Sequence, residues 1–387
     1  MFSTVSALRA VRRSRTARVV LATVAATAVG ATALVGTASA ADGCTRTISP
    51  GASVASAVQA LKAGETLCLR GGTYSGDVSA VLGKGTATSP ITVMSYPGER
   101  ATLVGATKFL GGEHWRVRGL GFTDPGSTAP IVKLIGGVGW HFTQNEVYDG
   151  AYAGILVGRS STYGVPHGYV ISENVVRDTT ASNLYHNPSR HSTGGLIERN
   201  LFFNSGTQNV KLGWGGSTVC SGSNYDEFGI GEVTFRYNTL YNGKQPLAIA
   251  ESGGERRVDV HRNLIGKGTA GYGVRIDSVE GCLKDNVWVH DNAVFAVSKL
   301  AEDFGDQPTI MKQMTSNLMG IDPKFDSTTA SGFHPTDTRV AGYGRYAGVT
   351  TTPTMPTEPV LEPISGVLVV PCPTDVAKLD AEVVLCA

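Results

Sequence analysis

The sequence has 387 residues, with 33 Lys+Arg against 32 Asp+Glu and a formal net charge of +1. This balance gives no reason to expect a nucleic acid or an anionic membrane surface as partner. Hydrophobic residues make up 41% of the chain and allow a sizeable core, while 49 glycines without a collagen-like period indicate many tight turns between short strands.

Residues 1–40 have the features of a signal peptide. An apolar stretch, residues 19–35, ends in the small residues Ala38-Ser39-Ala40, and five arginines precede it: Arg9, Arg12, Arg13, Arg15 and Arg18. We therefore expect secretion, with a mature chain from Ala41. An uncleaved membrane anchor is the alternative, which the weak apolarity of the stretch disfavours.

Six cysteines follow this segment: Cys44, Cys68, Cys220, Cys282, Cys372 and Cys386. An even number in an oxidising compartment predicts disulfides, and the absence of a C-x-x-C pair argues against a zinc site. Among the fifteen possible pairings, proximity in sequence favours Cys44–Cys68 and Cys372–Cys386, which leaves Cys220–Cys282.

A short amphipathic helix is predicted near the start of the mature chain. Val54, Ala57, Val58 and Leu61 have the i, i+3, i+4, i+7 spacing of one helical face, and Gly64 follows as a breaker. The next stretch, "AGETLCLRGGTYSG", is glycine-flanked and β-prone. We expect this helix to cover the first coil of a stack of strands.

A repeat follows, in which alternating apolar residues lead to an asparagine and a further apolar pair. Period-2 alternation predicts strands with one buried face, and a repeat of 25 to 38 residues predicts stacking of one unit on the next. The asparagines could bond along the stack and tolerate a left-handed turn. They are Asn145, Asn174, Asn200, Asn238, Asn263 and Asn292.

A further strand starts roughly ten residues after an asparagine, as in "AGILVG", "NVKLGW", "PLAIAES" and "GVRIDS". Together these patterns predict an all-β chain folded as a parallel β-helix over residues 41–348. A β-sandwich with chance asparagines is the alternative. A Pro/Thr-rich linker and tail, folded or disordered, then fill residues 349–387.

The predicted helix, "AGETLCLRGGTYSG" and "SPITVMSYPGERATLVGA" together resemble the N-terminal cap and first coil of right-handed parallel β-helix proteins. The closest likeness is to secreted polysaccharide lyases of the alginate lyase and chondroitinase B type, and "GIDPKFDSTTASGFHPTDTRVAGYG" resembles the usual end of such helices. The resemblance implies a solenoid fold and β-elimination on an acidic, uronate-containing polysaccharide.

The resemblance places Lys211, in "NVKLG", at the position of the family's catalytic base. The family's arginine strand aligns with "PLAIAES", where Ala248 and Ala250 stand instead. Strand alternation offers Arg275 as a substitute, because Lys211, Ala248 and Arg275 all point outward and would form one column, with Lys211 and Arg275 about 10 Å apart. Lys211 and Arg275 together could bind an acidic sugar. The alternative is two solvated surface cations.

The loop "NLYHNPSRH" supplies further candidates just before Lys211 along the chain. Tyr185 and His191 could act as acid or base, and His186 and Arg190 could bind substrate. Trp214 could stack on a sugar ring, and Glu251 is another candidate for substrate binding. An ordinary surface loop and plain packing are the alternatives.

Carboxylates near the same column allow a Ca²⁺ site formed by Glu251, Asp277 and Glu280. No Asp-x-Asp-x-Asp-Gly loop accompanies them. Glu302, Asp303 and Asp306 are predicted to form a solvated loop. No other cofactor motif is present.

Three functions remain open from the sequence. The favoured one is a secreted lyase acting on an acidic polysaccharide, as a monomer without nucleic acid or membrane partners. A glycoside hydrolase would instead use two carboxylates from the set Asp226, Glu227, Glu251 and Asp277. A non-catalytic glycan-binding or surface protein is the third.

Overall fold

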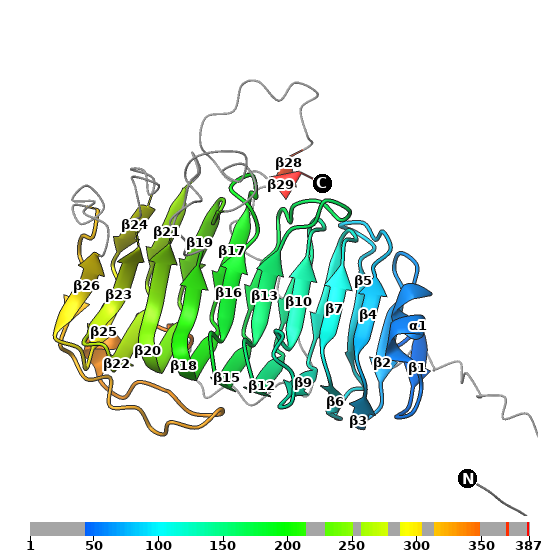
Figure 1. Ribbon diagram of the computed structural model, residues 1–387, viewed down its shortest axis with the longest axis horizontal. Coiled ribbons are helices and arrows are strands. Elements are labelled where there is room, and N and C mark those ends of the chain that lie inside the picture. The colour runs from blue at the N-terminus through cyan, green and yellow to red at the C-terminus, as the bar shows by residue number, and fades with distance from the viewer. Residues whose placement is uncertain are drawn as a thin grey trace, which may run out of the picture. The chain divides into compact units, whose positions relative to one another are not determined.

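The computed structural model describes residues 43–213, 229–250, 257–277, 287–303 and 313–348, together with the backbone of residues 369–370 and 385–386. Regular structure in these ranges is almost entirely β, arranged in parallel strands (Figure 1). Within the same ranges, no helix has the length and apolarity needed to cross a membrane.

The strands that precede the asparagines form one 10-stranded parallel sheet, called sheet A here. Neighbouring strands of this sheet follow one another in chain order, so that each repeat adds one strand. Its strands are β1 (Arg46–Ile48), β2 (Thr66–Leu69), β5 (Ile91–Ser95), β8 (Trp115–Arg118), β11 (His141–Thr143), β14 (Val170–Ser172), β17 (Gly195–Glu198), β19 (Val233–Arg236), β21 (Val258–His261) and β24 (Val287–His290).

The strands that follow the asparagines form a 17-stranded sheet, called sheet B, with two parallel ladders. The first ladder contains β3 (Gly72–Ser75), β6 (Ala101–Val104), β9 (Gly121–Asp124), β12 (Glu146–Gly150), β15 (Val175–Thr179), β18 (Leu201–Leu212), β20 (Thr239–Ala250), β22 (Leu264–Gly268), β25 (Ala293–Phe295) and β27 (Leu318–Met319).

The second ladder begins with β4 (Val78–Val81), β7 (Thr107–Leu110), β10 (Val132–Ile135), β13 (Ile155–Gly158) and β16 (Leu184–Asn187). It continues through the C-terminal halves of β18 and β20 to β23 (Tyr272–Asp277) and β26 (Lys299–Asp303). The long strands β18 and β20 belong to both ladders and join them. The predicted parallel β-helix is thereby confirmed.

The alternation of inward and outward residues along each strand explains why these segments stack. In β10, Val132 and Leu134 are buried while Lys133 is only half-buried, and the same alternating pattern recurs in β7, β8, β17, β19, β21 and β24. The inward residues of successive coils form one continuous apolar core. Each strand therefore contributes one face to the core and presents the other outward.

The six repeated asparagines form the expected ladder. Each backbone N–H from Asn145 to Asn263 donates to the side-chain oxygen of the next asparagine over 2.8–3.0 Å. Asn317, which the repeat pattern did not include, accepts from Asn292 and extends the ladder by one step. All six repeated asparagines are buried, and these bonds satisfy their polar groups.

The left-handed turn lies one residue earlier than the sequence suggested. The residues with positive φ, between +49° and +58°, directly precede the asparagines: Gln144, Glu173, Arg199, Tyr237, Arg262, Asp291 and Ser316. In the early copy without an asparagine, Gly119 occupies this position with φ of +67°. The asparagine therefore bonds along the stack, while its predecessor makes the turn.

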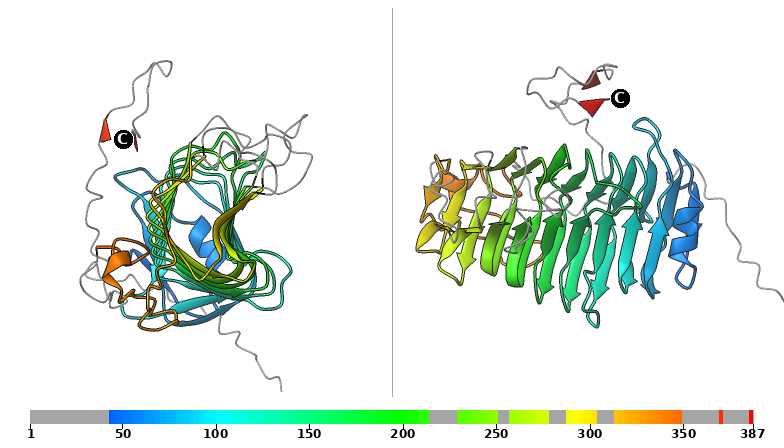
Figure 2. Two further views of the ribbon diagram at one scale, coloured as in Figure 1. Left: turned by 90° about the vertical axis from the view of Figure 1, so that its left-hand side faces the viewer. Right: turned by 45° about the horizontal axis from the view of Figure 1, so that its top comes forward.

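The predicted capping helix is confirmed as α1 (Val54–Gln59). Ser53 caps its first turn by accepting from the backbone N–H of Ser56, and Val54 and Val58 are buried at the start of the core. The helix packs against β4 and lies at the end of the sheets where β1 and β2 begin (Figures 1 and 2).

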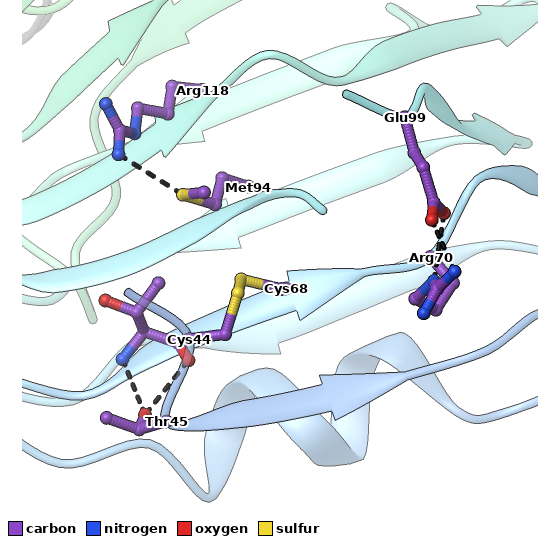
Figure 3. The surroundings of a disulfide bond; sticks show 8 residues. Cys44, Thr45, Cys68, Arg70, Met94, Glu99 and Arg118 are labelled. Atoms are coloured by element: carbon purple, nitrogen blue, oxygen red, sulfur yellow. Dashed lines mark hydrogen bonds and ion pairs between the residues drawn. A yellow bond between two sulfur atoms is a disulfide. The ribbon is translucent and has the colours of Figure 1, made fainter. Parts of the chain in front are cut away.

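The predicted disulfide between Cys44 and Cys68 is also confirmed (Figure 3). The two Cα atoms lie 5.7 Å apart, and β1 pairs with β2 so that Thr47 lies opposite Cys68. Leu67 and Leu69 face the core, and the alternation turns Cys68 to the outer face of sheet A. The bridge therefore fixes the N-terminal arm to the first coil. The other four cysteines lie outside the residues whose side chains the structure describes.

Residues 318–348 cover the outer face of the first ladder. Phe325 and Phe333 pack against Phe203 and Tyr241, with 5.1 Å between the ring centroids of Phe203 and Phe333. The segment includes the 3-10 helix η2 (Thr338–Val340). Beyond it, β28 (Val369–Val370) pairs in parallel with β29 (Leu385–Cys386), and the remaining residues of the tail lie outside the described ranges.

Candidate functional site

The outward positions of the second ladder form one continuous column, called the outer column. Strand register places its members opposite one another from coil to coil. They are Ser79, Lys108, Lys133, Leu156, Tyr185, Lys211, Ala248, Arg275 and Glu302.

Lys211, Ala248 and Arg275 thus occupy consecutive positions, as the alternation predicted. Two steps between parallel strands separate Lys211 from Arg275, which corresponds to about 10 Å. Both side chains are half-buried. An acidic group bound over Ala248 would have one cation on each side.

Tyr185 lies on the other side of Lys211. The Nζ atom of Lys211 is 5.2 Å from the centroid of the Tyr185 ring, within range of a cation–π interaction. Four consecutive positions of the column therefore hold a phenol, an amine, the methyl group of Ala248 and a guanidinium.

Ala248 is only 2% exposed, although it points outward. The aliphatic stems of long neighbours can cover a methyl group in this way. The alanine between the two cations therefore does not leave the open space that its small side chain would suggest.

Gly213 ends the strand that carries Lys211, and no other residue fits its conformation. Its φ is +90°, and a Cβ atom would lie 1.7 Å from the carbonyl oxygen of Ala250 in the next coil. Its N–H donates to the carbonyl of His186 over 2.8 Å. This close approach fixes the C-terminal end of the Lys211 strand between its two neighbours.

The loop after Tyr185 is held in a strained conformation. Ser189 has φ of +134° and is buried, and its N–H donates to the carbonyl of Gly229 over 3.2 Å. The N–H of Gly229 in turn donates to the side chain of Asn187. Such strain is found preferentially at functional sites. The loop presents Arg190 half-buried and His191 exposed.

His186 is placed differently from the sequence-based hypothesis. Its side chain is fully buried inside the coil, where Nε2 is hydrogen-bonded to the Tyr169 hydroxyl. Burial lowers the pKa of His186 to about 3, so the imidazole is neutral. The alternation that turns Tyr185 outward turns His186 inward, and His186 therefore does not reach a substrate on the outer face.

Lys108 and Lys133 extend the outer column and were missed in the sequence. The segments "TKFL" and "VKLI" have the same alternation as "NVKL", with a lysine between two buried residues. Burial, followed by the charge of Lys108, lowers the pKa of Lys133. These two neighbouring lysines add positive charge to the part of the column that lies nearer to α1.

Glu302 closes the column at its other end, opposite Arg275. It was predicted to lie in a solvated loop with Asp303, but both residues belong to β26, because this segment continues the second ladder. Lys299 forms an ion pair with Glu302.

Several predicted residues lie outside the described ranges. These are Trp214, Asp226, Glu227, Glu251, Glu280 and Asp306. For Asp277 the structure gives the backbone alone, which pairs with Ala250 at the end of β23. The Ca²⁺ site and the hydrolase carboxylates therefore stay predictions.

Comparisons with known proteins found no matching family model and no matching curated protein. Among solved structures, an alginate lyase from Paenibacillus sp. str. FPU-7 is 16% identical, covering 71% of this chain and 99% of that chain with a TM-score of 0.33.

A mannuronic acid specific polysaccharide family 6 lyase from human gut microbiota is 13% identical, covering 70% of this chain and 82% of its own, with a TM-score of 0.33. Pectate lyase Pel9A is also 13% identical, covering 71% of this chain and 77% of its own, with a TM-score of 0.36. The fold assignment given above rests on the strand pairing of this chain itself.

Proposed function

We propose that this chain is a secreted lyase that cleaves an acidic, uronate-containing polysaccharide by β-elimination. The observation that carries the proposal is the outer column, in which Lys211 lies between Tyr185 and the pair Ala248 and Arg275. A base, a proton donor and a cation for a carboxylate are the groups that elimination next to a carboxylate requires.

In the proposed reaction, the neutral amine of Lys211 takes the proton from the sugar carbon that bears the carboxyl group. The electron pair forms a carbon–carbon double bond, and the bond to the glycosidic oxygen on the neighbouring carbon breaks. Arg275 neutralises the carboxylate and so stabilises the developing anion. The leaving oxygen takes a proton from Tyr185, with His191 on the adjacent loop as the alternative donor.

The remaining cations favour an acidic polymer over a neutral one. Lys108 and Lys133 follow in the same column, one parallel-strand step apart. Sugar units along the column would place further carboxylates near these lysines. We infer that the polymer lies along the stack rather than across it.

The test is incubation of the secreted mature chain with alginate, pectate, chondroitin sulfate and hyaluronan, with and without added Ca²⁺. Elimination gives ultraviolet absorbance from the new double bond. Reducing ends without that absorbance would identify a hydrolase, and binding without any cleavage across this panel and neutral glycans would identify a glycan-binding protein. Either of these results would overturn the proposal.

A further inference from the structure

A second cluster of chemically active side chains lies on the outer face of sheet A, on its last two strands. Asp259 and His261 are two residues apart on β21, and His290 lies opposite His261 on β24. The Oδ1 atom of Asp259 is 3.1 Å from His261 Nδ1 and 2.9 Å from His290 Nε2. All three ligand-type atoms lie within 4.8 Å of one another.

These atoms lie close enough together for all three to reach one metal ion. In a tetrahedral zinc centre, bond lengths of about 2.0–2.2 Å put neighbouring ligand atoms about 3.3 Å apart. The two imidazole rings are stacked, with an interplanar angle of 12° and 5.2 Å between their centroids. Adjacent coils therefore hold both nitrogens on the same side of the sheet, next to one carboxylate oxygen.

The contacts of His290 point to a cation in the cluster. Its Nδ1 is 2.8 Å from Asp291 Oδ2, while its Nε2 faces Asp259 Oδ1. A carboxylate only accepts, so an Nδ1–H that donates to Asp291 leaves the lone pair of Nε2 for a metal. A histidine ligand whose second nitrogen donates to a carboxylate is the usual outer-shell arrangement of metal sites.

Asp259 keeps one oxygen for such a metal. Arg257 forms an ion pair with Oδ2 over 2.7 Å and leaves Oδ1 toward the histidines. The side chains of Asp259, His261 and His290 are 14%, 22% and 26% exposed, so a hydrated ion can reach them from solvent.

We propose that Asp259, His261 and His290 bind a divalent transition metal of the Zn²⁺ class, with a fourth position open to solvent. Two imidazoles and a carboxylate suit zinc better than Ca²⁺, which prefers oxygen ligands. The bound metal would fasten β24, the last strand of sheet A, to β21. The sequence argued against zinc only through its cysteine spacing, and this site uses no cysteine.

The test uses the untagged mature chain, stripped with a chelator and titrated with Zn²⁺ by calorimetry. The expected result is one bound equivalent for the wild type, with binding weakened at least tenfold in His261→Gln and in His290→Gln. Zn²⁺ should raise the Tm of the wild type more than that of either variant at the same concentration.

His334→Gln is the matched control. His334 also contacts a carboxylate, Asp326, over 2.7 Å, but it has no second histidine beside it, and this variant should bind Zn²⁺ like the wild type. The proposal is overturned if the wild type binds no Zn²⁺, or if either cluster variant binds as tightly as the control. Circular dichroism without metal checks that each variant folds, and Co²⁺ absorption spectra of the wild type provide a second readout of tetrahedral coordination.

Discussion

At the scale of single residues, strand alternation decides which side chains can take part in chemistry. Tyr185 and His186 are adjacent in sequence, but Tyr185 faces the outer column while His186 faces the core. The side chain of Leu184 in "LYHN" already indicates this, because an inward leucine forces an inward residue two positions later. The same inspection of the sequence would have excluded His186 from the candidate site.

The buried histidine makes the stability of the protein depend on pH. The pKa of His186 is about 3 in the folded chain against an ordinary value of 6.5, so the unfolded chain takes up the proton first. The contribution of the neutral imidazole to the free energy of unfolding is fully present above about pH 6.5 and declines as the pH falls toward 3.

Between pH 7.5 and 5, this linkage should lower the free energy of unfolding by about 2 kcal/mol, because each unit of pKa difference corresponds to about 1.4 kcal/mol. His186→Gln should remove that part of the pH dependence. Burial also lowers the pKa of His141, to about 4, and its contribution persists in both proteins. Urea unfolding at both pH values measures the difference, and equal pH dependence in variant and wild type would refute this account.

At the scale of the structural elements, the asparagine ladder ties each coil to the next. The Nδ2 atom of Asn200 donates to Ile171, Glu198 and Asn238, and its Oδ1 accepts from Asn174. The repeat in the sequence predicted the ladder because buried amides need partners, which only neighbouring copies supply. It could not show which residue adopts the left-handed turn, because side chains as different as those of Glu173, Arg199 and Tyr237 precede the asparagines.

Asn200→Ala should cost about 3 kcal/mol or more, since it leaves several buried backbone groups without partners. Asn317→Ala is the comparison at the end of the ladder. Asn317 is half-buried, accepts from Asn292 and donates to Val289, but donates to no further asparagine, and a smaller loss of about 1 kcal/mol is expected. Urea midpoints at constant m-value compare the two, and equal losses would contradict the ladder's stabilising role.

The disulfide acts on the N-terminal element. A double Cys44→Ser, Cys68→Ser variant should lose about 3 kcal/mol, the loop-closure entropy of a bridge between residues separated by 24 positions. The loss should appear as reduced protection of β1 and β2 in hydrogen exchange, with the later coils unaffected. Unchanged protection of β1 would show that strand pairing alone holds the arm.

The sequence also contains the signal for the proposed metal site. Two adjacent copies, "VDVHRN" and "VWVHDN", place histidine two residues before the asparagine, and stacking of copies brings these histidines together. Asp259 follows from the same pattern, because a residue two positions before His261 in the strand faces the same side of the sheet.

At the scale of the whole described structure, the two proposed sites lie on two separate outer surfaces. The C-terminal segment covers the first ladder, while the second ladder presents the outer column and sheet A presents the Asp259 cluster. The alternation in "NVKLG", "LAIA" and "VRID" predicted the central part of the column. Alternation alone does not place Lys108 and Lys133 in the column, because their position depends on the register between successive coils.

The central claim is that Lys211 is the base of an elimination reaction. The most direct measurement is the initial rate of double-bond formation, followed by ultraviolet absorbance, on the uronate polymer that the wild type cleaves. Lys211→Ala should lower kcat by at least about a hundredfold, the usual contribution of a general base. Lys84→Ala, whose lysine pairs with Glu113 away from the column, should retain the wild-type rate. Wild-type kcat in folded Lys211→Ala would contradict the account.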